Sequence, residues 1–302
     1  MRIVAEGLLF PEGPVAMADG SVLFVELARG TLSRVHGDGT VNVVADVGGS
    51  PNGAAIGPDG RVYVANNGGV KFVEQSGKLR PAGNLPDPAW IDAVDLVTGD
   101  IQRLYDRCGE HTLRHCNDLV FDSNGGFYFT DTGKTTSTMN ERGGVYYAKA
   151  DGSEIRRVAF PLANPNGVGI SPDGSTLYVS ETLTARLWAW DILGPGQLRK
   201  LKQNDVPHGG RFVIGSANYQ RFDSLAVSAS GKVLVGTLTN GGISEIWPDG
   251  SYVKHHPLPD GHVTNIAFGG ADMRTAFVTM AGSGKLVALD WHEPGLVLAY
   301  NA

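Results

Sequence analysis

The sequence predicts an all-β protein, a six-bladed β-propeller of four-stranded antiparallel blades around a central channel. A hairpin-like segment recurs six times, and its spacing of about 40 to 65 residues is that of propeller blades. The chain also holds 42 glycines and 16 prolines, as a fold with many tight turns requires. A propeller of this size is one domain, so residues 1–302 are expected to form a single domain.

The repeated segment is clearest from Asn166 to Glu181, which reads NGVGISPDGSTLYVSE. Two apolar runs flank a Pro-Asp-Gly turn, the pattern of a β-hairpin. Each copy begins at a polar residue, which we call its opener. The six openers are Glu12, Asn52, Asn117, Asn166, Asp223 and Asn265. Eight residues after the opener, five copies have glycine and the last has Met273, and a β-rich apolar run follows every time.

Strand-like pieces between the hairpins complete the blades. They are residues 31–36, 91–96 with 101–105, 144–148 with 155–158, 186–190, 242–247 and 286–291. Ring closure needs a terminal strand, and residues 3–4 and 296–300 are the candidates. The Gly/Pro-rich residues 68–88 are expected to form a long surface loop that shapes a pocket.

Composition limits the possible partners. The net charge is −6 without a basic stripe, which argues against nucleic acid and acidic membranes. The N-terminus lacks a signal peptide's apolar run, and no stretch approaches the ~20 apolar residues of a spanning helix. We expect a cytoplasmic monomer or simple homo-oligomer acting on a small molecule, with Cys108 and Cys116 as free thiols.

The openers should face one another around the channel, because equivalent positions in the blades lie on a ring. Carboxylates and amide oxygens that converge on one point suit a hard divalent cation. The alternative is that they are turn residues whose side chains cap their own backbone. That alternative does not explain Glu12, a poor turn residue. We therefore favour Glu12, Asn166 and Asp223 as metal ligands, with calcium, magnesium or manganese favoured by the oxygen donors.

Other polar residues are weaker candidates. His111, His115 and Cys116 precede the third opener without a second group at zinc-site spacing, so they are expected to line the pocket or the surface. Asp118 is the only charged residue directly after an opener, and either a catalytic carboxylate or a hydrogen-bonded structural residue fits it. Three acidic residues end strands and are expected near the opposite mouth of the channel: Glu26, Asp131 and Glu181. Nucleophile-elbow, dinucleotide and P-loop motifs do not occur.

At its openers the chain resembles the SMP-30/gluconolactonase/luciferin-regenerating-enzyme family. Short motifs along nearly the whole chain carry the resemblance: Glu12-Gly13-Pro14, Asn117-Asp118, Asn164-Pro165-Asn166-Gly167, Asp223-Ser224 and Phe268-Gly269-Gly270. The resemblance implies a six-bladed propeller that holds one divalent cation in its channel. Its ligands would be Glu12, Asn166 and Asp223, and relatives also work with zinc or iron.

The resemblance further implies hydrolysis of sugar lactones. The cation would act as Lewis acid on the carbonyl, Asp223 would be the general base, and Asn117 and Asn52 would orient the substrate. Family lactonases have an arginine two residues before the Asn-Asp pair, where this chain has His115. A related lactone or ester with fewer hydroxyls is therefore credible. Ester or organophosphate hydrolysis, isomerisation or condensation at the same site, and a non-catalytic binding propeller, stay open.

Overall fold

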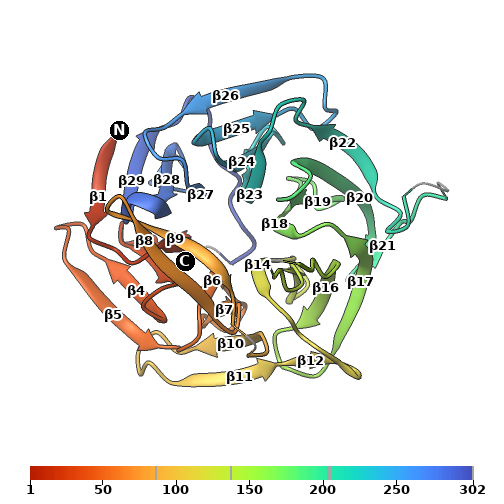
Figure 1. The fold of residues 1–302 in the computed structure, drawn as a ribbon, viewed down its shortest axis with the longest axis horizontal. Coiled ribbons are helices and arrows are strands. Elements are labelled where there is room, and N and C mark those ends of the chain that lie inside the picture. The colour runs from red at the N-terminus through yellow and green to blue at the C-terminus, as the bar shows by residue number, and fades with distance from the viewer. Residues whose placement is uncertain (86, 137, 203–205, 301–302) are drawn as a thin grey trace.

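The computed structural model describes residues 1–302 except 86, 137, 203–205 and 301–302. Its strands form six antiparallel sheets in a ring around a central channel (Figure 1), which confirms the predicted fold class. In blades 1 to 5 the first strand lies innermost and the chain runs outward through the following strands, whereas in blade 6 the outermost strand is β1 from the start of the chain. The innermost strands are β2 (Pro11–Ala16), β6 (Pro51–Ile56), β14 (Cys116–Phe121), β18 (Pro165–Ile170), β23 (Arg221–Val227) and β27 (Val263–Gly269).

The remaining strands follow in order of blade. Blades 1 and 2 add β3 (Val22–Glu26), β4 (Thr31–Val35), β5 (Val41–Asp46), β7 (Val62–Asn66), β10 (Trp90–Val94) and β11 (Ile101–Tyr105). Blades 3 and 4 add β15 (Gly126–Asp131), β16 (Gly143–Lys149), β17 (Ile155–Leu162), β19 (Thr176–Glu181), β20 (Arg186–Gly194) and β22 (Arg211–Gly215), with the short β21 (Gln197–Leu198) beside β20. Blades 5 and 6 add β24 (Val233–Leu238), β25 (Gly242–Ile246), β26 (Val253–Pro257), β28 (Thr275–Met280), β29 (Lys285–Asp290) and β1 (Arg2–Glu6).

Local turn chemistry sets the hairpins of the repeat. In blade 4 the Asp173 carboxylate accepts the backbone N–H of Ser175 at 3.0 Å, and Gly174 has a φ of 71°. The aspartate holds the turn and the glycine supplies the left-handed residue that the reversal needs. Asp19 and Asp59 accept backbone N–H groups in the same way in blades 1 and 2. The turn signals in the sequence therefore correspond to real hairpins.

Glycine directly after an opener lets neighbouring inner strands approach closely. A Cβ at Gly13 would lie 2.6 Å from the Asn52 carbonyl oxygen, and one at Gly53 would lie 2.6 Å from the carbonyl oxygen of Asn117. Real Cβ atoms do not come so close to backbone. Because glycine has no side chain, the neighbouring inner strands, and with them the openers, can lie close together around the channel.

The first strand of the chain closes the ring. β1 pairs antiparallel with β29 and becomes the outer strand of blade 6, with Ile3 opposite Val287. Of the two predicted closing segments, residues 3–4 thus form the strand and residues 296–300 do not. The latter cross the channel end opposite the openers, where the Leu296 N–H donates to the Val227 carbonyl oxygen at 2.9 Å. The Tyr300 ring packs edge-on against Phe121 there, 5.7 Å between centroids.

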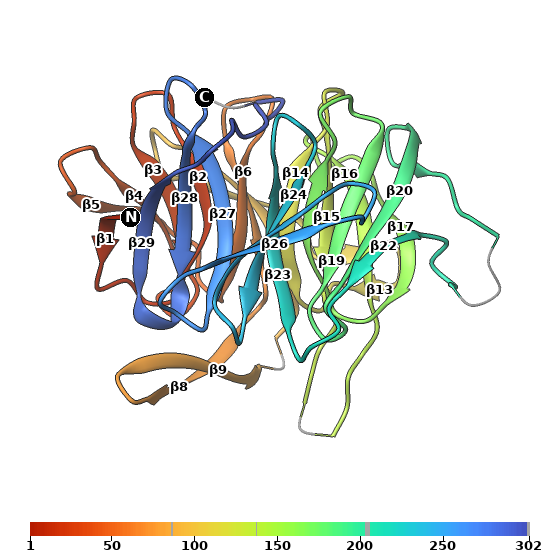
Figure 2. The ribbon, with the colours of Figure 1, turned by 90° about the horizontal axis from the view of Figure 1, so that it is seen from above.

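Residues 68–88 contain a hairpin, where the sequence predicted only a loop. β8 (Val70–Gln75) and β9 (Lys78–Asn84) pair with each other and leave the ring between β7 and β10. Figure 2 shows this hairpin and the C-terminal end at opposite ends of the channel. The hairpin reaches from blade 2 to blade 6, where Arg80 contacts His262, and Phe72 packs 5.1 Å from Phe10 on the way. It therefore lies over the end where the chain enters its inner strands.

Short elements complete the described chain. β12 (Arg107–Cys108) pairs with β13 (His111–Thr112), and Cys108 and Cys116 are free thiols. The helical structure of the described residues is one 3₁₀ turn, η1 (Ala281–Ser283). A search of those residues accordingly finds no helix that could cross a bilayer.

Removal of residues 1–6 tests ring closure. It would bare the edge of β29 and lose the buried Ala5, so the free energy of unfolding should fall by about 3 kcal/mol in urea titration. Ile3→Thr is the control, because Ile3 is 48% exposed and the strand would persist. An unchanged urea midpoint after removal of residues 1–6 would contradict closure by β1.

Candidate metal and active site

A break in strand pairing marks every opener. The pairing register shifts beside Glu12 in β2, across Asn166 in β18 and across Asp223 in β23, and the other three inner strands do the same. A β-bulge bends the strand and re-aims a side chain. All six openers are buried, less than a tenth exposed, at the same end of their strands. They form the ring that the sequence predicted, which we call the opener ring.

Three carboxyl groups act on one another in this ring. Burial raises the pKa of Glu12 to about 7, although hydrogen bonds from Thr264, Gly13 and Asn265 oppose the shift. Burial, and then the charge of Glu12, raise the pKa of Asp118 to about 7. The same two causes raise the pKa of Asp223 well above its usual range. The site therefore favours positive charge, either as protons or as a cation.

Asp118 joins the site although it is not an opener. Its Oδ1 accepts the Leu119 N–H at 2.9 Å, and its Oδ2 accepts the Val168 N–H of the next blade at 3.4 Å. Asp118 is therefore a hydrogen-bonded structural residue, which is one of the two interpretations that the sequence allowed. Its carboxyl group also borders the channel, where the charge of Glu12 contributes to its raised pKa.

The amide openers differ in whether their side-chain oxygen has a hydrogen-bond partner. Both side-chain groups of Asn265 are paired: its Nδ2 donates to Glu12 at 3.1 Å, and its Oδ1 accepts the Ile266 N–H at 2.8 Å. The Oδ1 atoms of Asn52 and Asn117 are buried and have no hydrogen-bond partner among the described residues. A buried carbonyl oxygen without a donor is costly, so both point to a bound group that would use them.

Asn166 is held between blades 4 and 5. Its Nδ2 donates to Thr182 Oγ1 at 3.1 Å, and its Oδ1 accepts from Ser224 Oγ at 3.3 Å. These contacts turn the amide oxygen toward the neighbour of Asp223. Ser224 uses one lone pair of that oxygen, so among the described residues the other lone pair is available to a cation, as the sequence predicted.

Two contacts hold His115 in place. Its backbone N–H donates to Asp131 Oδ1 at 2.9 Å, and its imidazole Nδ1 lies 2.9 Å from Thr132 Oγ1. Its Nε2 is buried without a partner in the described part of the chain. Burial and the nearby Lys134 lower the pKa of His115 to about 4. The imidazole is therefore neutral near pH 7, unlike an arginine at this position.

The acidic strand ends lie at the opener end, so their predicted place at the opposite mouth is wrong. Glu26, Asp131 and Glu181 end the second strand of a blade, not the inner one. Each accepts a backbone N–H from the segment that enters the inner strand, as Glu181 does from Ala163 at 2.6 Å. Sequence reasoning missed this role, whose signal is the acidic residue closing the second apolar run. Together these residues hold the openers in place from behind.

Below the opener ring the channel is apolar and closed. A cavity of about 100 Å³ lies between the ring and residues 296–300. Val15, Val120, Ile170 and Phe268 line it, with Asp118 at its upper edge. The channel is therefore polar at the opener ring and apolar below it, and residues 296–300 cover the end beyond the cavity.

The comparisons with known proteins agree with this architecture. The model of the SMP-30/gluconolactonase/LRE-like region matches residues 10–282. Lactonase drp35 of Staphylococcus saprophyticus is 34% identical over 205 residues, 65% of this chain but 55% of that protein, so the match spans about half of the relative.

Two solved structures have the same fold. A gluconolactonase from Xanthomonas campestris has a TM-score of 0.73 at 24% identity, covering 94% of this chain and 86% of that one. Regucalcin from Agrobacterium tumefaciens, described as a calcium-binding protein, has a TM-score of 0.72 at 17% identity, covering 98% and 97%. At these identities the likeness concerns the fold alone. The family match, which spans most of the sequence, confirms the resemblance seen in its motifs: the chain belongs to the SMP-30/gluconolactonase/LRE-like family.

Proposed function

We propose that this protein is a metal-dependent lactonase, in which Glu12, Asn166 and Asp223 hold one divalent cation and Asp223 is the general base. The observation that carries the proposal is the burial of Glu12, Asp118 and Asp223 together in the channel, where each raises the need for a compensating positive charge. The name of the drp35 relative supports the reaction. The description of regucalcin makes calcium the first ion to test, with magnesium, manganese, zinc and iron(II) as alternatives.

The donor set fits such an ion. Two carboxylates and an amide oxygen are hard ligands, and their two negative charges would balance a dication. The partnerless oxygens of Asn52 and Asn117 would then face the ion's remaining ligands or the substrate. When bound, the ion would polarise the lactone carbonyl and stabilise the developing oxyanion.

The chain's own residues would carry out the proton transfers. Asp223, as a carboxylate, would take a proton from the water that adds to the carbonyl carbon. When the ring C–O bond then breaks, the same carboxyl group would return that proton to the leaving alkoxide. Asn117 and Asn52 would orient the substrate, and the β8–β9 hairpin would restrict water over this end of the channel.

His115 bears on the choice of lactone. A neutral imidazole offers one free nitrogen, Nε2, where an arginine would offer several charged donors. Fewer substrate hydroxyls can therefore be paired here. This favours a lactone or ester less hydroxylated than a sugar lactone.

Asp223→Asn should lower lactone hydrolysis by about a hundredfold or more while the circular dichroism spectrum is retained, because the amide cannot accept the proton. The control is Asp173→Asn, which changes an exposed turn aspartate in blade 4. Turnover at the wild-type rate by Asp223→Asn would remove this residue from the mechanism.

Elemental analysis of the protein loaded with calcium should find one calcium ion per chain. The ion should be absent from the Glu12→Gln/Asp223→Asn double variant, which lacks both ligand charges, and present in the control Glu6→Gln/Asp272→Asn, which changes exposed acids. Equal metal content in the two double variants would count against the opener ring. Absence of metal from the wild type after soaking with the five candidate ions would favour a non-catalytic binding propeller.

His115→Arg should shift the ratio of kcat/KM values toward polyhydroxylated lactones, relative to unsubstituted ones, by about tenfold for each charged hydrogen bond gained. His111→Arg, at an exposed position of the same segment, is the matched control. If the ratio stays the same in His115→Arg, residue 115 does not read substrate hydroxyls.

A further inference from the structure

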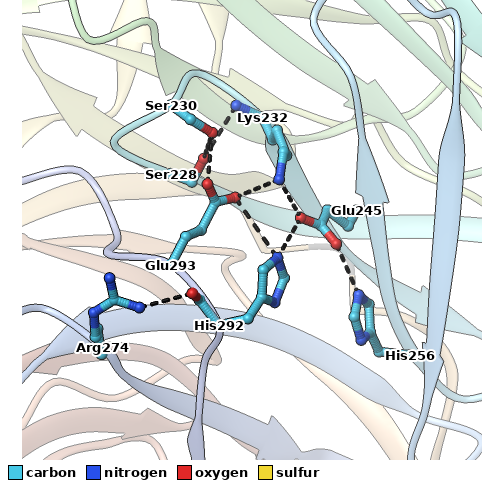
Figure 3. A network of polar contacts seen from close by, with 8 residues as sticks. All are labelled: Ser228, Ser230, Lys232, Glu245, His256, Arg274, His292 and Glu293. Carbon is cyan, nitrogen blue, oxygen red and sulfur yellow. Dashed lines mark hydrogen bonds and ion pairs between the residues drawn. The ribbon is translucent and has the colours of Figure 1, made fainter.

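A second polar cluster, which shares no residue with the opener ring, lies between blade 5 and the segment after β29 (Figure 3). Its centre is Glu245 on β25, whose side chain is 1% exposed. The Oε1 of Glu245 accepts from Lys232 Nζ at 3.0 Å and from His292 Nε2 at 2.9 Å, and its Oε2 accepts from His256 Nε2 at 2.9 Å. Glu293 adds a second carboxylate, 3.0 Å from Lys232 Nζ.

The ligand atoms are close to metal-binding geometry. One donor atom from each of Glu245, His292 and Glu293 lies within 4.8 Å of the other two. His292 Nε2 is 2.9 Å from the Glu245 oxygen and 4.0 Å from the Glu293 oxygen. Ligands of a tetrahedral zinc ion stand about 3.3 Å apart, since each bond is about 2.0 to 2.1 Å long. The measured separations bracket that value, so small side-chain movements would complete a three-ligand site.

In this structure the ammonium group of Lys232 fills the position that a metal ion would take between the two carboxylates. Its ammonium group bonds both carboxylates, and its charge compensates one of their two negative charges. A dication with neutral imidazole would compensate both. Lys232 lies 4.6 Å from the Trp247 ring and is 18% exposed, so its head group has a route to water.

We propose that Glu245, His292 and Glu293 form a second metal site, selective for a transition-metal dication such as zinc, and that Lys232 competes with the metal for it. The imidazole ligand distinguishes the site from the all-oxygen opener ring, because nitrogen donors suit zinc and cobalt better than calcium. His256 positions Glu245 through its other oxygen.

A metal ion in this second site would link blade 5 to the segment that follows β29. Glu245 belongs to blade 5, whereas His292 and Glu293 begin the segment that leads to residues 296–300 at the channel end. A metal bound by all three joins these parts and is lost on unfolding. The unfolding temperature should therefore rise with the metal concentration.

Cobalt(II) is the probe, because its visible absorption reports ligand geometry. The full chain carrying Glu12→Gln/Asp223→Asn is titrated, so that the opener ring does not add to the count. We expect one Co²⁺ per chain, bound at least about tenfold more tightly when Lys232→Met is added. Lys254→Met, which removes an exposed lysine from β26, should leave the affinity unchanged.

His292→Ala in the Lys232→Met chain should abolish the absorption and the rise in unfolding temperature. His255→Ala, the matched histidine control on β26, should preserve both. Retained cobalt in His292→Ala, or no cobalt in the Lys232→Met chain, would overturn the proposal. If the double ring variant does not fold, the same titrations are made on the chain with an intact ring saturated with calcium. Neither result depends on lactonase activity.

Discussion

The burial of Glu12, Asp118 and Asp223 in one channel is the constraint on which the site depends. Taking carboxylates out of water disfavours their ionised forms, and each charge raises the proton affinity of the next. Without a cation the three groups share protons. A dication bound as proposed would displace those protons, so its affinity would depend on the protonation of the three groups. The propeller can hold the three groups close together because each projects from the inner strand of a different blade.

The support for the opener ring lies mostly in the backbone. Bulges aim the side chains, glycines bring the inner strands together, and acidic residues behind the ring hold the entering segments. Glu181, for example, accepts hydrogen bonds from the Ala163 N–H and from Thr184 Oγ1, and so holds the segment that leads to Asn166. Side chains that project from strands are positioned more precisely than side chains on loops.

The repeat predicted the blades and the opener ring because both depend on local signals. A Pro-Asp-Gly turn is readable in one sequence, and symmetry then places equivalent residues together. Asp118 and Glu12 affect one another across blades, and no spacing rule reveals that. The hairpin of residues 70–84 was missed because its glycines and prolines mask a strand pattern. The Glu245 cluster includes residues from β25, β26 and the segment after β29. They are far apart in sequence, so only the three-dimensional structure shows them together.

The pairing of β1 with β29 also has a consequence for biosynthesis. Arg2 pairs with Ala288, so the ring cannot close until Ala288 has left the ribosome. Blade 6 is thus completed by the most distant contact in sequence, the kind that forms late and slowly. Until then β1 has no partner strand and the apolar face of blade 1, which includes Val22 and Phe24, is not covered by blade 6, and apolar surface exposed in this way favours aggregation.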